Sequence, residues 1–212
     1  MTTDTELFTA EEIEENFNTF RAWCEKTGER APKVLEMVDV LGTNLAICPA
    51  SSKPDYHLPI PGGLVKHSLN VLENAVKIRR AFKWNIPDES LILCTLFHDI
   101  GKVGHVERAS DGTRTIIDTY VDAEEWKQRR FQEKYRVNPD MPKWKIPQLS
   151  VFLMQEFEIR LSRSEYLAIL LNDGWCLEEN KDYGLRVEPL VICVQQADYI
   201  STCIEGKRDL GF

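Results

Sequence analysis

The chain has 212 residues, of which 43% are hydrophobic and 28% are charged, and its formal net charge is −8. This negative balance argues against a protein that coats duplex DNA, because neutralising the phosphate backbone needs a basic surface. It does not exclude a small phosphorylated ligand held in a local cationic pocket. We expect a single domain, since a chain of this length can bury a substantial core in one unit.

The sequence has no apolar run long enough to span a membrane, and its first residues, MTTDTELFTAEE, are too acidic and polar for a signal peptide. Its six cysteines are scattered and form no CxxC pair. These features predict reduced cysteines and a cytoplasmic protein without a membrane partner. They are compatible with a homo-oligomer.

Residues 1–48 carry signals for packing helices and no visible chemistry. Thr9 and Glu12 have the spacing of a capping box, and Phe17 and Phe20 then follow the helical period. A second short helix is predicted from Lys33, with a stop at Gly42.

Residues 49–63, PASSKPDYHLPIPGG, read as a loop because they contain four prolines and two glycines. The loop leads into a predicted helix from Leu64 to Lys83, and His67 lies on its apolar stripe. A core histidine with a hydrogen-bond partner explains that position as well as a metal ligand does. The stripe consists of Leu64, Val71, Ala75, Ile78 and Phe82.

Pro87 opens the next predicted helix, which places His98 and Asp99 in its last turn before Gly101. An aspartate at a helix C-terminus opposes the helix dipole, so a positive partner is expected there. A metal ion would satisfy it, and Lys102 is the weaker alternative. A histidine beside an aspartate, with a second histidine on the preceding helix, provides the mixed nitrogen and oxygen ligands of a divalent metal site.

The segment from Val103 to Tyr120 predicts a small β-hairpin, because the turn signal ASDGTR separates the β-prone runs HVER and RTIIDTYV. Residues 123–148 are rich in charge, aromatic residues and proline. They suggest either a local basic rim or a solvated helix followed by a proline loop.

The last third of the chain predicts three more helices. One runs from Leu149 to Phe157, and a second capping box at Ser162 introduces YLAILL, which ends at Asn172-Asp173-Gly174. The final helix begins at Glu188-Pro189 and closes at Gly206. Asp198 lies beside its core face, where a nearly buried carboxylate has to be paired or bind a metal. That face consists of Leu190, Val194, Ala197, Ser201 and Ile204.

The motifs GGLVKHS, FHDIGK and ADYIST, in this order and spacing, resemble the signature of the HD-domain metal-dependent phosphohydrolase superfamily over about residues 55–205. The stretch from Val137 to Gly174 is also similar to a subgroup of small bacterial and phage HD hydrolases. The resemblance implies an all-α fold: one HD-type domain over residues 1–212, with packing helices in 1–48, a metal-site core in 55–205 and a small hairpin after the HD motif.

The resemblance further implies that His67, His98, Asp99 and Asp198 hold a divalent metal ion (Mn, Fe, Co, Ni, Zn or Mg). A water activated by that metal would attack the phosphorus of a small phosphorylated substrate, with a nucleotide as our prediction. Relatives with two metals carry further histidines, whereas this chain has Asn172 in a corresponding segment and no histidine after His105. We therefore expect one tightly held metal.

Three further residues are candidates around that centre. Lys102 can bind a substrate phosphate or simply offset Asp99. His105 can act as a general acid, or be a surface residue of a β-prone run. His57, in the proline-rich loop, is a candidate for substrate binding. The predicted catalytic set is thus Asp99, Lys102 and His105, and the predicted substrate-binding set is His57 and Lys102.

Two alternatives to a nucleotide phosphohydrolase remain. The opening YHLPIPGGLVKHS is also similar to HD exoribonucleases, which suggests a 3′-to-5′ exonuclease on single strands, although no separate nucleic-acid-binding domain is visible. An HD module that senses a nucleotide without hydrolysing it is the other. A complete set of four ligands favours catalysis over sensing.

Overall fold

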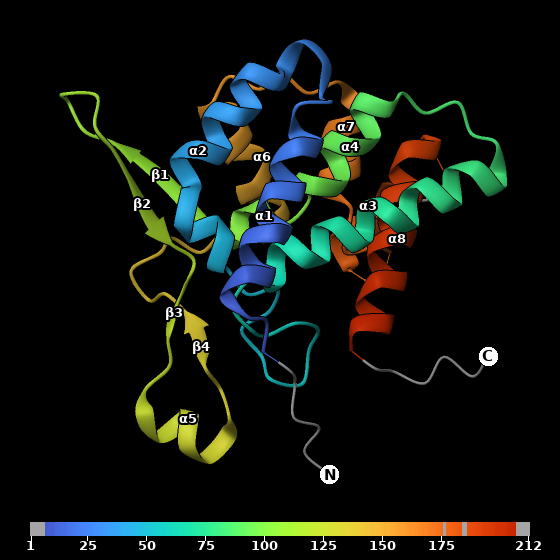
Figure 1. Cartoon of the computed structure of the whole chain (residues 1–212). Helices are drawn as coiled ribbons and strands as arrows, with labels where there is room; N and C mark the ends of the chain where they lie inside the picture. The colour runs from blue at the N-terminus through green and yellow to red at the C-terminus, as the bar shows by residue number, and fades with distance from the viewer. Residues whose placement is uncertain (1–6, 176, 184–185, 207–212) are drawn as a thin grey trace.

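The computed structural model describes residues 7–175, 177–183 and 186–206. Its body consists of helices that pack around one apolar core, with two small antiparallel strand pairs outside it (Figure 1). The all-α fold with a hairpin after the HD motif is therefore confirmed. The helices are α1 (Ala10–Cys24), α2 (Ala31–Ile47), α3 (Gly63–Phe82), α4 (Asp88–Phe97), α5 (Glu125–Phe131), α6 (Ile146–Glu156), α7 (Arg163–Leu170) and α8 (Pro189–Glu205).

The helix starts follow the capping signals. Thr9 and Ser162 each accept a hydrogen bond from the backbone N–H of the glutamate three residues later. The carboxylate of that glutamate in turn accepts one from the backbone N–H of the cap residue. Pro189 occupies the first position of α8, and Gly206 is its C-cap. Short 3₁₀ turns cover Gly28–Arg30 (η1), Ile100–Lys102 (η2) and Glu178–Tyr183 (η3).

Several predicted boundaries are wrong. Helical geometry does stop at Gly42, as predicted, where the backbone φ is 39°, but a second helical stretch follows directly and α2 extends to Ile47. The HD helix α4 ends at Phe97, so His98 is its C-cap and Asp99 has already left helical geometry. The predicted apolar stripes include Phe82 and Ile204, but these residues are 65% and 59% exposed. Phe82 instead stacks on Trp84 near the end of α3.

The hairpin consists of β1 (Gly104–Arg108) and β2 (Arg114–Asp118), which pair in the register of His105 with Ile117. The second pair, β3 (Tyr120–Asp122) and β4 (Tyr135–Val137), was not predicted. It encloses α5, so residues 120–137 form an arm that projects from the helical body (Figure 1). Residues 123–148 thus contain the expected solvated helix but also a strand.

The core sits between the helices that carry the candidate ligands. Phe20 of α1 packs edge-on against Phe97 of α4, with ring centroids 5.4 Å apart. Helices α3 and α8 lie against each other along the body (Figure 1). Because both His67 and Asp198 lie on buried or half-buried faces of this pair, core packing fixes their relative position.

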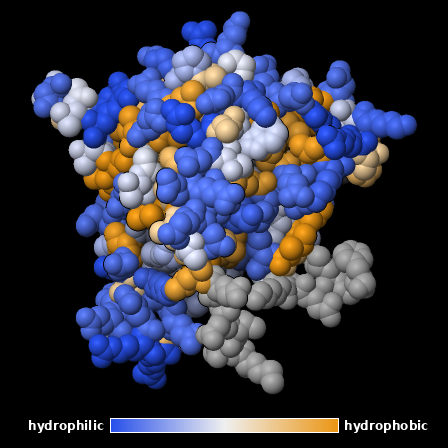
Figure 2. Space-filling view, in the orientation of Figure 1, coloured by the Kyte–Doolittle hydropathy of each residue, from blue (hydrophilic) through white to orange (hydrophobic). Residues whose placement is uncertain are grey.

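The described cysteines Cys24, Cys48, Cys94, Cys193 and Cys203 are free and buried. No helix in the described part of the chain combines the length and apolar character needed to cross a membrane. The face shown in Figure 2 is mostly hydrophilic, with apolar side chains in small separate groups.

Candidate metal centre

His67 is positioned by a close approach at the start of α3. A Cβ at Gly63 would lie 2.2 Å from the carbonyl oxygen of Leu58, so only glycine lets the proline-rich loop fold back over this helix. His67 lies one turn further on, and its side chain is fully buried. The glycine in GGLVKHS thus sets the entry of the helix that carries the histidine.

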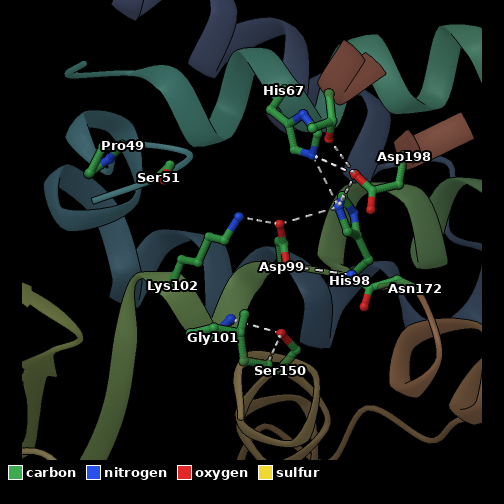
Figure 3. Close-up of polar contacts among 12 residues, drawn as sticks. Pro49, Ser51, His67, His98, Asp99, Gly101, Lys102, Ser150, Asn172 and Asp198 are labelled. Carbon is green, nitrogen blue, oxygen red and sulfur yellow. Dashed lines mark hydrogen bonds and ion pairs between the residues drawn. The ribbon is translucent and has the colours of Figure 1, made fainter. Parts of the chain in front are cut away.

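His98 and Asp99 are held by a second close approach. A Cβ at Gly101 would meet the Ile146 carbonyl oxygen at 2.7 Å and the Ser150 amide nitrogen at 2.8 Å, both on α6. The Gly101 amide donates to Ser150 Oγ at 2.9 Å (Figure 3). The 3₁₀ turn that follows Asp99 is therefore anchored directly on α6.

The two histidines meet through their Nε2 atoms, which lie 3.3 Å apart. Asp198 Oδ1 is 3.1 Å from Nε2 of His67 and 3.7 Å from Nε2 of His98 (Figure 3). Asp99 Oδ2 lies 3.5 Å from the same His98 nitrogen. The donor atoms of His67, His98 and Asp198 therefore lie within 4.8 Å of one another, and Asp99 approaches this group beside His98.

The Nδ1 atoms of His67 and His98 each lie within hydrogen-bond distance of an acceptor oxygen. His98 Nδ1 lies 2.9 Å from the Thr95 carbonyl oxygen, and His67 Nδ1 lies 2.8 Å from Glu205 Oε2. Since a carbonyl and a carboxylate can only accept, we assign the hydrogen of each neutral ring to Nδ1. Both Nε2 lone pairs then face each other and two carboxylates, an arrangement that needs a cation or a proton between them. A divalent metal fits this donor set of two imidazoles and two carboxylates.

Glu205 contacts the candidate centre, although it is not among the predicted site residues. Its second oxygen, Oε1, accepts a hydrogen bond of 2.8 Å from Asn70 Nδ2, so the carboxylate is fixed between Asn70 and His67. The available signal was spacing: Glu205 lies seven residues, or two helical turns, after Asp198, and Asn70 lies three residues after His67. All four side chains therefore project into the same α3–α8 seam.

Charge in this seam shifts the pKa values of the histidines. Burial disfavours the charged form of His67, but Asp198 and Glu205 outweigh it and raise its pKa to about 10. The pKa of His98 is also raised, because Asp99 and Asp198 overcome its burial. The pKa of Asp198 lies well below its usual value, despite burial, through its contacts with the two histidines. The centre is thus strongly attractive to positive charge.

Lys102 is the direct partner of Asp99, with Nζ 2.5 Å from Oδ2 (Figure 3). Burial would raise the pKa of Asp99, but Lys102 and His98 lower it to about 2. The side chain of Lys102 is only 11% exposed, and its pKa is raised by Asp99 despite burial. Lys102 thus supplies part of the positive charge expected opposite Asp99. A metal bound at the centre would supply the rest.

A pocket of about 540 Å³ opens over the centre. Its lining includes Asp99, Lys102 and Asp198, together with His57 and Asp173. Asp173 lies at the exposed rim, where partial desolvation and the charges of Asp99 and Asp198 raise its pKa to about 6. The pocket is therefore the route by which a small molecule would reach the candidate ligands.

His57 lines this pocket, and its ring centroid is 4.6 Å from that of His67. Within the described residues neither of its buried ring nitrogens has a hydrogen-bond partner. Burial, followed by the charges of His67 and Lys102, lowers its pKa to about 4. His57 also forms a second potential metal-binding group with His67 and Glu205. The structure thus brings His57 to the site, as a neutral imidazole.

The structure places His105 elsewhere. It lies on β1, with Nδ1 3.1 Å from Met141 Sδ and Nε2 3.5 Å from Glu107 Oε1. It does not belong to the described lining of the pocket. Asn172, in contrast, is buried beside the centre, and its Nδ2 lies 3.5 Å from Asp99 Oδ1 (Figure 3).

The family model of the HD domain matches residues 64–203, a span that contains His67, His98, Asp99 and Asp198. The chain therefore belongs to the HD-domain family, whose members are generally metal-dependent phosphohydrolases. Comparisons with curated proteins and with solved structures found no match.

Proposed function

We propose that this protein is a metal-dependent phosphohydrolase that cleaves phosphoester or phosphoanhydride bonds of nucleotides or short oligonucleotides. The observation that carries the proposal is the meeting of two imidazole Nε2 atoms and Asp198 Oδ1 beneath a pocket that also contains Lys102. When bound, a divalent cation would lower the pKa of a water molecule and neutralise charge on phosphate oxygens. We propose His67, His98, Asp99 and Asp198 as its ligands.

The remaining residues have separate roles in this proposal. Glu205 and the Thr95 carbonyl keep both Nε2 atoms free of hydrogen and aimed at the centre. Lys102 offers an ammonium group to a substrate phosphate from the side of Asp99. His57 forms part of the wall beside His67.

The proposal is tested by removing metal with a chelator, restoring Mn²⁺, Fe²⁺, Co²⁺, Ni²⁺, Zn²⁺ or Mg²⁺, and measuring phosphate release. The substrates are nucleoside mono-, di- and triphosphates, cyclic dinucleotides and short single strands. We expect turnover with at least one metal, and its loss in Asp198→Ala. Asp182→Ala, which changes an exposed aspartate in η3, is the matched control. Nucleotide binding without turnover under every metal would instead identify a sensing module.

A further inference from the structure

A second hollow adjoins the pocket over the metal centre. It has a volume of about 550 Å³, close to the 540 Å³ of the first, and both lie in the size range of small-molecule sites, roughly 300–1,000 Å³. Lys102 and Tyr120 line both hollows. The two spaces therefore adjoin at the side chain that contacts Asp99.

The loop after α2 runs along both hollows. Pro49 lines the second hollow and Ser51 lines the first, and Figure 3 shows both beyond Lys102, on the side away from Asp198. A phosphate beside Lys102 and the candidate ligands would thus have one space towards Asp198 and another towards the arm of residues 120–137.

The second hollow is unsuited to a second phosphate. Asp118 and Asp122 line it, and Lys102 is the single cationic residue in its described lining. Asp118 Oδ1 already accepts a hydrogen bond of 2.6 Å from Asn44. Carboxylates accept hydrogen bonds from hydroxyl and amino groups but repel phosphate.

Its other walls suit a ring that bears hydroxyl or amino groups. Tyr120 and Tyr135 contribute aromatic surface, on which nucleobases stack. Burial raises the pKa of Tyr120 to about 12, so its hydroxyl remains a hydrogen-bond donor at neutral pH. Ile47, at the end of α2, adds apolar surface.

We infer that the substrate is a phosphodiester with a nucleoside on each side of the phosphorus, one in each hollow. This inference rests on the proposed function and specifies its substrate class. A nucleoside monophosphate would fill one hollow only, and the polyphosphate of a nucleoside triphosphate would meet Asp118 and Asp122 in the other.

The reaction is a hydrolysis that balances without a further reactant. Water supplies a hydroxyl group to phosphorus and a proton to the departing nucleoside oxygen, while the bond between phosphorus and that oxygen breaks. The products are one nucleotide and one nucleoside, and nothing is oxidised or reduced.

The test compares a dinucleoside monophosphate, adenylyl-adenosine, with adenosine monophosphate and with 4-nitrophenyl phosphate, using the metal-loaded enzyme. Ile47→Trp places a larger side chain in the second hollow. Because Ile47 is 50% exposed, this change leaves the core intact. Ile204→Trp is the matched control, because Ile204 is 59% exposed and lines neither hollow. Thermal melting of both variants checks that they are folded.

We expect kcat/KM for the dinucleoside to exceed that for the monophosphate by about tenfold or more, and to fall by about tenfold or more in Ile47→Trp. The same variant should leave 4-nitrophenyl phosphate hydrolysis within about twofold of the wild-type value, and Ile204→Trp should change neither activity. Faster cleavage of the monophosphate, or an equal loss on all substrates in Ile47→Trp, would overturn the inference alone. Absence of metal-supported turnover on every substrate would overturn the proposed function itself.

Discussion

His67 and Glu205 are joined across the α3–α8 seam by a bond of 2.8 Å between Nδ1 and Oε2. Because Asn70 holds the other oxygen of Glu205, the carboxylate cannot rotate away without losing a second hydrogen bond. The pair fixes the ring orientation of His67 and makes its Nε2 more electron-rich, as carboxylates do for histidines that bind metals.

Glu205→Gln should therefore weaken metal binding without removing a ligand. The amide has no negative charge and presents only one acceptor oxygen, so we expect the affinity for Zn²⁺ or Mn²⁺ to fall by about 10- to 100-fold. Competition with a calibrated chelator measures this directly. Glu73→Gln, which changes an exposed carboxylate on α3, is the control. Wild-type affinity in Glu205→Gln would mean that the contact only packs the helices together.

Asp99 and Lys102 should show strong coupling in stability. Their side chains are 9% and 11% exposed, so Asp99→Ala leaves the ammonium group of a nearly buried lysine without its partner. Breaking one side of a buried pair costs about 3–5 kcal/mol, and Lys102→Met in the same chain should recover most of that loss. Chemical denaturation of the metal-free proteins gives all the free energies of unfolding in the cycle. Additive effects of the two changes would show that the pair contributes nothing.

Gly101→Ala should disturb the metal centre through packing alone. The added methyl group would meet backbone atoms of Ile146 and Ser150 at 2.7 and 2.8 Å, distances that no side-chain rotation relieves. We expect a loss of about 1–3 kcal/mol in stability, together with weaker metal binding as Asp99 moves. Ser150→Ala adds no atom at this contact. It removes the hydrogen bond from the Gly101 amide and the one that Ser150 Oγ donates to the Ile146 carbonyl oxygen, and it should cost about 1 kcal/mol. Equal losses in the two variants would contradict the steric explanation.

The sequence predicted what depends on local spacing. Capping boxes and the hairpin turn are set within a few residues, and both are found in the structure. The helical stripe of His67 is found from Leu64 to Ile78, but not at Phe82, which is exposed. The grouping of His67, His98, Asp99 and Asp198 came from the ordered motifs, not from any single one. Helix periodicity alone left His67 open to a purely structural interpretation.

Other features depend on contacts between distant segments, and periodicity did not reveal them. Glu205 meets His67 only because α8 packs on α3, and α4 ends early because the turn at Gly101 docks on α6. The β3–β4 pair joins residues on either side of α5. Such pairings leave no regular pattern within either segment.

Because of His57, the free energy of unfolding should fall as the pH is lowered. Its pKa is lowered from the ordinary value of about 6.5 to about 4 by burial and by the nearby positive charges. The folded state therefore resists a proton that the unfolded chain accepts. The full stability is present above pH 6.5 and is lost as the pH falls towards 4. Between pH 7 and pH 5 this one group should lower the free energy of unfolding by about 2 kcal/mol.

His57→Leu should remove that loss, because leucine has no basic nitrogen that could accept a proton. The substitution also breaks no hydrogen bond within the described residues, since neither buried ring nitrogen has a partner among them. We expect the stability of the variant to fall by about 2 kcal/mol less than that of the wild type between pH 7 and pH 5. Urea denaturation of both proteins at pH 7, 6 and 5, with and without saturating metal, measures the difference. His105→Leu, at a partly exposed histidine on β1, controls for the loss of an imidazole. Parallel stability curves for the wild type and His57→Leu would show that His57 accepts its proton as readily in the folded protein as in the unfolded chain.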